Sequence, residues 1–303
     1  MTIILLTLKE HQSGIWNTLL IDRLKELNQS VEVVTLESTL TCFSNPFPVE
    51  TKIVINRVSD ASALYKATVA LLECCESLWN IRVWNSAYAL CVNKWCHSGI
   101  LERAGLASPA TWRLYQQEHT APDTAFPLLY KPNAGGFGAG IVKIEGPQDS
   151  LPKTNDDMAV LQEYIKPLDN QVYRVWFLLG KVQCGLIRQN YEGVDEFTTG
   201  CAATGACLLK NRDAKQPTLL AYQVPGDICH EIESQLLPLL PSAHCGSVEF
   251  LCNDNGKRLY FDINLLSTLP LVETVENSRE VWGADYDPWM ELANAIVQFS
   301  VSM

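Results

Sequence analysis

The apolar positions of the first 85 residues alternate between two periodicities. Three short runs rich in β-branched residues are typical of buried strands: residues 2–7, 31–36 and 52–58. Between and after them, residues 15–27 and 61–76 repeat apolar side chains at helical spacing. The alternation of strand and helix predicts a parallel sheet, and we interpret residues 1–85 as an N-terminal α/β lobe.

From residue 86 onward the pattern changes. One helix is predicted over roughly 86–105, with further helices near 225–239 and 288–299. The remaining apolar runs are short strands: residues 127–131, 140–144, 159–165, 173–179, 181–188, 246–252 and 258–264. Turn signals at 180–181 and 253–256 join two pairs of these strands. The pattern predicts an antiparallel α+β body, which we divide into a central lobe (86–165) and a C-terminal lobe (166–303).

Composition narrows the class of protein. The 303 residues carry 23 basic and 34 acidic side chains, a net charge of −11, which disfavours a general nucleic-acid binder. Hydrophobic residues at 47% argue against disorder, and no apolar stretch has the length of a membrane span. The 11 cysteines include no CxxC pair, and the first residues do not resemble a secretion signal. We therefore expect a soluble, cytoplasmic protein with reduced thiols.

A glycine-rich loop follows the predicted strand that ends at Lys131. Four of six residues in it are glycine: Gly135, Gly136, Gly138 and Gly140. Glycines let the backbone approach a ligand closely, and their N–H groups can cradle phosphate oxygens beside a lysine. The alternative is a flexible hairpin loop with an incidental lysine.

Two predicted strands near the C-terminus carry acidic side chains among apolar ones. Asp262 and Asn264 are two residues apart and point to one face, which Glu249 shares if the strands pair through the turn at 253–256. Two carboxylates and an amide oxygen are hard ligands that suit Mg²⁺ together with nucleotide phosphates. The alternative is a polar, solvent-facing side of the sheet.

The segment 162–169 reads as a strand end followed by a proline turn, suited to a hinge between lobes. Its backbone could pair with an adenine edge, and Glu163 or Asp169 could accept from ribose hydroxyls; otherwise it is an ordinary strand end. Other nucleotide and hydrolase motifs are missing from the sequence, including GxxxxGK[ST], GxGxxG, GxSxG and HExxH.

The order of these features resembles the ATP-grasp superfamily, and within it the RimK-like carboxylate–amine ligases. The resemblance rests on the segments 84–94 and 101–111, on Lys131-Pro132 with its glycines, and on Asp262-Ile263-Asn264. It covers roughly residues 52–300. It implies an ATP-grasp fold with an N-terminal pre-ATP-grasp lobe, a central lid lobe and a C-terminal catalytic lobe.

The resemblance also implies an ADP-forming ligase that joins a carboxylate to an amine through an acyl phosphate. Its cofactors would be ATP and Mg²⁺, with two ions expected and Mn²⁺ as an alternative. The residues implied are Lys94, Lys131, Gly135, Gly136 and Gly138 for the phosphates, Gln162, Glu163 and Ile165 for adenine, Asp169 for ribose, Arg188 and Arg174 for catalysis, and Glu249, Asp262 and Asn264 for metal.

The chain departs from the family pattern at three places. Val172 stands where an acidic residue is usual, Asp262 replaces the more common glutamate, and residues 265–270 differ from the usual small-residue turn. The last difference suggests an unusual acceptor. The N-terminal lobe and the loop 190–207 are expected to select the substrates, with Trp16, Arg57 and Tyr65 among the candidates.

Two other functions stay open. A kinase of a small hydroxylated metabolite, such as an inositol phosphate, would need a basic pocket that the acidic composition disfavours. A non-catalytic nucleotide-binding module would be expected to have lost the lysines or metal ligands. The expected partners are ATP, a carboxylate and an amine, without nucleic acid or membrane. The oligomeric state is left open, with a homo-oligomer as one alternative.

Overall fold

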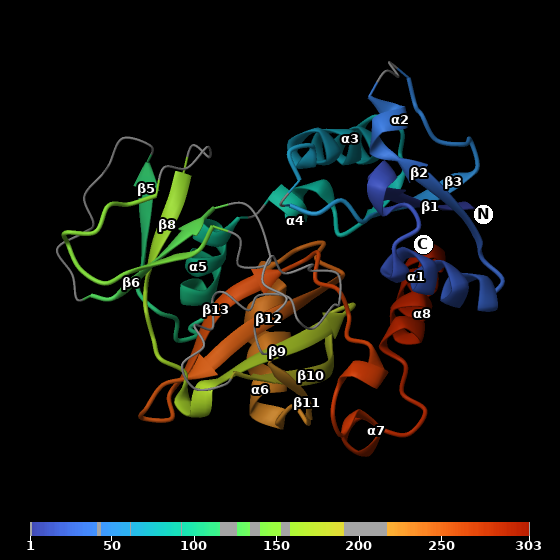
Figure 1. The fold of residues 1–303 in the computed structure, drawn as a ribbon. Helices are drawn as coiled ribbons and strands as arrows, with labels where there is room; N and C mark the ends of the chain where they lie inside the picture. The colour runs from blue at the N-terminus through green and yellow to red at the C-terminus, as the bar shows by residue number, and fades with distance from the viewer. Residues whose placement is uncertain are drawn as a thin grey trace.

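The structure, a computed structural model, contains three β-sheets in chain order (Figure 1). It describes residues 2–40, 44–60, 62–91, 93–115, 126–133, 140–152, 158–190 and 217–302. A parallel sheet comes first and two antiparallel sheets follow, so the predicted combination of α/β and α+β parts is confirmed.

The N-terminal sheet is fully parallel. Its strands are β1 (Thr2–Thr7), β2 (Ser30–Thr35), β3 (Thr51–Asn56) and β4 (Arg82–Trp84), in the order β2-β1-β3-β4. The helical segments around it are η1 (Lys9–His11), α1 (Ile15–Glu26), α2 (Leu36–Thr39) and α3 (Tyr65–Ser77). Every residue of β1 is buried, as expected for a central strand covered on both faces.

The single helix predicted over 86–105 is wrong. Two helices occupy this region, α4 (Ala87–Cys91) and α5 (Lys94–Arg103). Asn93 between them has an extended backbone, with φ −111° and ψ 177°, and its side chain accepts a hydrogen bond from Cys96 N at 3.1 Å. Asn93 is therefore the N-cap of a new helix, a role that asparagine favours.

The central sheet is antiparallel and has the order β5-β8-β6-β7. Its strands are β5 (Thr111–Tyr115), β6 (Leu128–Pro132), β7 (Val142–Ile144) and β8 (Met158–Glu163). One face packs into a small core that includes Leu128, Tyr130 and Leu161. Because side chains alternate along a strand, Lys131 points to the other face.

The C-terminal sheet is also antiparallel, in the order β11-β10-β9-β12-β13. Its strands are β9 (Gln171–Leu178), β10 (Lys181–Gln189), β11 (Thr218–Tyr222), β12 (Cys245–Cys252) and β13 (Arg258–Asn264). Leu179 and Gly180 both have positive φ in the β9–β10 turn, which is typical of a tight hairpin. In the β12–β13 turn, Gly256 N donates to Asn253 O at 2.8 Å.

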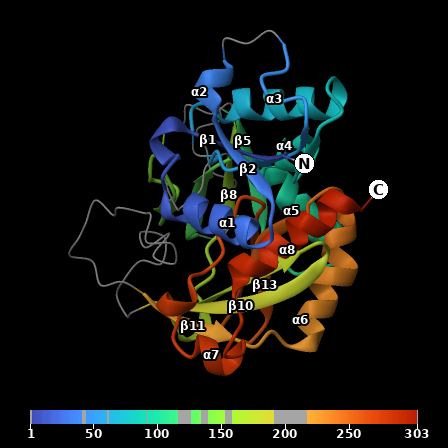
Figure 2. The same cartoon turned by 90° about the vertical axis from the view of Figure 1, so that its right-hand side faces the viewer.

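The helical segments in the same part of the chain are η2 (Leu168–Asn170), α6 (Gly226–His230), η4 (Glu231–Leu236), η5 (Leu237–Leu239), η6 (Val272–Thr274), α7 (Ser278–Val281) and the longer α8 (Pro288–Val301). Helix α8 lies beside α1 (Figure 2), where Trp16 and Trp289 stack with their centroids 5.5 Å apart. This contact joins the two ends of the chain through a shared core. Within the described parts of the chain, no helix combines the length and apolar character that crossing a membrane requires.

Candidate functional site

One face of the C-terminal sheet gathers charged side chains from neighbouring strands. In the strand register, Glu249 lies opposite Asp262 on one side and opposite Arg174 on the other. Directly opposed residues of antiparallel strands point to the same face, and residues two apart along a strand share it. We call this surface the polar face and define it by Arg174, Arg188, Glu249, Asp262 and Asn264.

The polar face is held by specific contacts. The guanidinium of Arg174 donates through Nη2 to Glu249 Oε1, and the side chain of Glu249 is only 10% exposed. A buried carboxylate needs such a partner, because it loses its hydration on folding. Asn264 Oδ1 accepts from Leu266 N at 2.9 Å, which orients its amide at the end of β13.

A β-bulge beside Glu249 changes the direction of one side chain. Glu249 is opposite Asp262 but the next residue, Phe250, is opposite Tyr260, so Phe261 is the extra residue. Bulges of this kind re-aim side chains, often next to functional sites. The Phe261 ring centroid lies 5.2 Å from Lys131 Nζ, which places the central sheet against the polar face.

Lys131 is buried at this junction and is held by a relay of two hydrogen bonds. The residue is 6% exposed, and its Nζ donates to Gln162 Oε1 at 2.6 Å. Gln162, which is 4% exposed, donates in turn from Nε2 to Thr111 Oγ1 at 3.0 Å. The relay fixes the position of the ammonium group, because both ends of the Gln162 amide are hydrogen-bonded, one to Lys131 and the other to Thr111.

The electrostatics show which charges surround Lys131. Burial lowers the pKa of Lys131 to about 8, Asp262 and Glu249 act to raise the pKa, and Lys94 acts to lower it. The structure therefore brings four predicted site residues, two lysines and two carboxylates, within electrostatic range of each other. The lysines lie on α5 and β6, and the carboxylates lie on β12 and β13 of the C-terminal sheet.

Lys94 is placed by the ends of two elements. It is the first residue of α5, directly after the N-cap Asn93. Asn133, two residues beyond Lys131, accepts from Trp95 N at 3.2 Å and so ties the end of β6 to the start of α5. The sequence interpretation missed the roles of Asn133 and Thr111. Asn93 carried a visible signal, an N-cap residue type before a helical pattern.

The predicted hinge begins inside β8, whose last residue is Glu163, and continues beyond it. Glu163 N donates to Ala110 O at 2.8 Å, and Tyr164 N donates to Pro127 O at 3.1 Å. Glu163 Oε2 accepts from Ala110 N at 3.3 Å. The N–H groups of Glu163 and Tyr164 are therefore already paired within the protein.

Asp169 adopts a left-handed conformation with φ 53° in the turn before β9. Its carbonyl accepts from Gln189 Nε2 at 2.6 Å, next to Arg188 on β10. The turn that carries Asp169 is thus fixed to the strand that carries Arg188.

Some predicted residues lie outside the described residues: Gly135, Gly136, Gly138 and the loop from 191 to 207. Of the four glycines in the loop, the structure describes Gly140. It has φ +75°, and a Cβ there would meet Pro132 Cγ at 2.8 Å, so the position requires glycine.

The donor set of the polar face suits a hard cation. Across the described ranges, no three His, Cys, Asp or Glu side chains gather closely enough to hold a metal ion by themselves. Glu249 and Asp262 instead form a carboxylate pair with the Asn264 amide two residues along β13. A set made only of oxygen donors favours Mg²⁺ over zinc and leaves coordination positions for a ligand's oxygens.

No family model matches the sequence, and no curated protein matches it. Solved structures do match along nearly the whole chain. D-cycloserine synthetase DcsG is 13% identical with a TM-score of 0.68, over 98% of this chain and 99% of that one. The ATP-grasp ligase PsnB, complexed with a phosphomimetic variant of a minimal precursor, Mg and ADP, is 14% identical with a TM-score of 0.66, over 98% of both chains.

A third match is D-alanine–D-alanine ligase from Bacillus anthracis, complexed with ATP. It is 15% identical with a TM-score of 0.67, over 99% of this chain and 97% of that one. At such low identity the likeness concerns architecture alone. The resemblance drawn from the sequence is confirmed at that level: the chain has the ATP-grasp fold.

Proposed function

We propose that this protein is an ATP-dependent carboxylate–amine ligase that releases ADP and phosphate. The observation that carries the proposal is the meeting of Lys94 and Lys131 with Glu249 and Asp262 where two sheets of an ATP-grasp fold face each other. Two of the solved structures with this fold contain ATP, or Mg and ADP. The residues 1–85, 86–165 and 166–303 would serve as substrate lobe, lid and catalytic lobe.

The lysines would bind the nucleotide phosphates. Lys131 presents a buried ammonium group that Gln162 and Thr111 hold in place before ligand arrives. Such preorganisation is effective because no side chain has to be reoriented as charge develops. Gln162 would thereby act as a positioning residue, and adenine would lie against the segment around Ile165.

Glu249, Asp262 and Asn264 would hold Mg²⁺. When bound, the ion would supply positive charge to the transferring phosphoryl group. Arg174 keeps the Glu249 carboxylate paired and oriented on the polar face without the ion. Asp262 lies directly opposite Glu249 in the register, which sets the two carboxylates side by side.

The proposed reaction has two steps. A substrate carboxylate oxygen attacks the γ-phosphorus of ATP, the bond to the bridging oxygen breaks, and ADP leaves. The amine nitrogen then attacks the acyl phosphate carbonyl, the bond from that carbon to the phosphate oxygen breaks, and the amide forms as inorganic phosphate leaves with the proton lost by the amine. The first step brings two anions together, so Lys94, Lys131 and Arg188 would neutralise the repulsion. The sequence lacks a side-chain nucleophile motif, and this chemistry requires none.

The test is ADP release measured with panels of carboxylates and amines, each alone and in combination. A ligase requires one member of each panel, and mass spectrometry should identify an amide product. Asp262→Asn should abolish turnover, with Asp254→Asn in the exposed β12–β13 turn as the matched control. ADP release with a single hydroxylated substrate would indicate a kinase, and nucleotide binding without any turnover would indicate a binding module. Either outcome would contradict the proposal.

A further inference from the structure

Arg57 lies at the carboxyl end of the N-terminal sheet, where the order of strands reverses. The chain passes from β1 to β2 on one side, and β3 then pairs with β1 on the other. Ligands of open parallel sheets bind beyond the carboxyl ends of the strands at such a switch point. Thr7 ends β1 and Arg57 follows β3 directly, with Arg57 N donating to Leu6 O at 2.8 Å.

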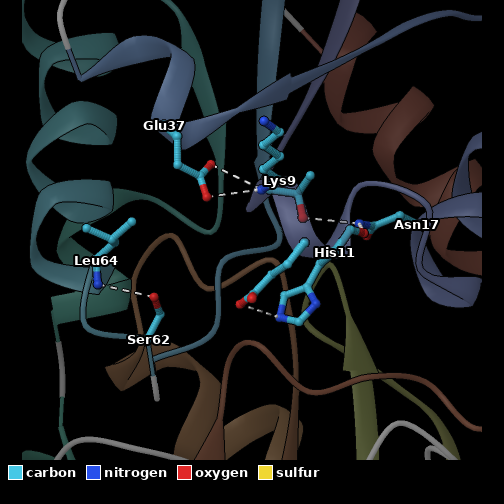
Figure 3. Close-up of polar contacts among 8 residues, drawn as sticks. Lys9, His11, Asn17, Glu37, Ser62 and Leu64 are labelled. Atoms are coloured by element: carbon cyan, nitrogen blue, oxygen red, sulfur yellow. Dashed lines mark hydrogen bonds and ion pairs between the residues drawn. The ribbon is translucent and has the colours of Figure 1, made fainter.

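The side chain of Asn17 fixes the direction of Arg57. Asn17 is 5% exposed and lies beside the turn after β1 (Figure 3). Its Nδ2 donates to Thr7 Oγ1 at 3.1 Å and to His11 O at 2.8 Å. Because these two acceptors fix the amide nitrogen, Oδ1 faces the other way, where it accepts from Arg57 Nε at 3.4 Å.

The charge of Arg57 is not balanced by a carboxylate in the described chain. Arg23, Arg174 and Arg258 each form an ion pair with Asp or Glu, and Arg57 forms none within 4.0 Å among the described residues. Burial lowers the pKa of Arg57, and the group that acts to raise it is the thiol of Cys245. Nε is directed at Asn17. The two terminal nitrogens, Nη1 and Nη2, lie in one plane and can donate together to the two oxygens of a carboxylate.

Arg57 is also connected to the polar face. Cys245, its electrostatic neighbour, begins β12 and precedes Glu249 by four residues, a distance of about 13 Å along a strand. Asn85 holds this arrangement by accepting from Cys245 N at 2.9 Å and donating to Leu265 O at 2.7 Å. The end of the N-terminal sheet is therefore fixed to the two strands that carry Glu249 and Asp262.

We propose that Arg57, oriented by Asn17, binds a substrate through a carboxylate group that takes no part in the reaction. The inference rests on the proposed ligase function and names its substrate class: an amino acid, a short peptide or a dicarboxylic acid, one end at Arg57 and the reacting end near the polar face. A single guanidinium among the neutral side chains of Thr7 and Asn17 matches one negative charge. A phosphate monoester would call for further cations.

The experiment compares acids with their amides, which lack the carboxylate charge, as probes. D-alanine, L-alanine and glutarate, with alaninamides and glutaramide as partners, are titrated into the full-length protein and followed by ligand-observed NMR. At least one acid should bind about tenfold more tightly than its amide. This preference should disappear in Arg57→Gln, persist in part in Arg57→Lys, and be unchanged in Arg103→Gln, a change at an exposed arginine. Thermal unfolding of each variant checks that it is folded. If Arg57→Gln does not fold, Arg57→Lys serves as the test in its place.

The inference and the proposed function fail in different measurements. Lys131→Met and Asp262→Asn should abolish ADP release yet keep the preference for acids over amides. Equal binding of acids and amides to the unmodified protein would overturn the Arg57 site, as would a preference that survives in Arg57→Gln. A preference lost in Lys131→Met but kept in Arg57→Gln would also overturn it, by placing the acid among the phosphate-binding residues.

Discussion

The surroundings of Lys131 and Arg57 share one design and differ in one respect. In each, a cation donates to a side-chain amide oxygen, and the nitrogen of that amide donates to a threonine hydroxyl. Gln162 and Thr111 hold Lys131, while Asn17 and Thr7 hold Arg57. Lys131 has Asp262 and Glu249 nearby to balance its charge, whereas no carboxylate among the described residues acts on the pKa of Arg57.

This difference indicates what each cation can bind. A lysine balanced by two carboxylates suits a ligand that brings its own cation, such as a nucleotide with Mg²⁺. An arginine that has no carboxylate partner in the described part of the chain suits an anion that arrives alone. Under the proposed function, the nucleotide would be bound beside Lys131 at β13 and the substrate carboxylate beside Arg57 near the start of β12.

The largest effect on turnover should come from substitution of Asp262, one of the two carboxylates near Lys131. Asp262→Asn removes a charge that we propose binds the metal ion, and we expect turnover to fall by about 100-fold or more, the scale at which groups stabilising transition-state charge act. Steady-state ADP release measures it. Asp254→Asn, in the exposed turn, should change it little. A loss below threefold in Asp262→Asn would contradict the role assigned to Asp262.

Substitution of Gln162 and of Asn17, the amide side chains that hold Lys131 and Arg57, should affect the binding of different ligands. Gln162→Leu leaves the buried Lys131 ammonium without its acceptor, and we expect ATP affinity to fall roughly tenfold, the scale of a hydrogen bond to a charged group. Asn17→Leu should instead weaken acid binding and leave ATP affinity unchanged. Calorimetric titration of both ligands into both variants gives the comparison. If either variant weakened both ligands equally, the relays would not act separately.

The pH dependence should show opposite slopes for nucleotide binding and for stability. Burial lowers the pKa of Lys131 to about 8, so the free protein loses this charge above that pH. ATP phosphates favour the protonated form, so ATP affinity should fall above pH 8 and binding should take up a proton. Stability should rise between about 8 and the unfolded lysine pKa near 10.5, because there the unfolded chain binds more protons.

Lys131→Met is the variant that tests this assignment, and Lys257→Met, at an exposed lysine, is its control. The pH dependences of ATP affinity and of stability should both weaken in Lys131→Met and persist in Lys257→Met. Calorimetry in buffers of different ionisation enthalpy measures the proton uptake, and urea unfolding measures the stability. Unchanged slopes in Lys131→Met would assign them to another group.

The smallest effect concerns the helix that presents Lys94. Asn93→Ala removes the side chain that accepts from Cys96 N, and loss of an N-cap lowers the free energy of unfolding by about 1 kcal/mol. Urea unfolding measures this change. Asn255→Ala in the exposed β12–β13 turn offers a comparison. An unchanged unfolding free energy in Asn93→Ala would show that α5 does not depend on this cap.

The sequence by itself determined the features that depend on neighbours along the chain. The β-branched runs predicted most strands, and the turn at 253–256 with the two-residue period predicted that Glu249 shares a face with Asp262 and Asn264. The order of these segments also predicted the ATP-grasp fold. Such features are readable because periodicity and turn chemistry are local properties of the backbone.

Only the tertiary structure decided the contacts between distant segments. Strands β5 and β11 were not predicted, since each is short and acquires its pairing from strands elsewhere in the chain. The bulge that turns Phe261 toward Lys131 depends on the register with β12. Arg57 meets Asn17 across 40 residues of chain. A periodic pattern states which way a side chain points, but packing decides which charge it meets there.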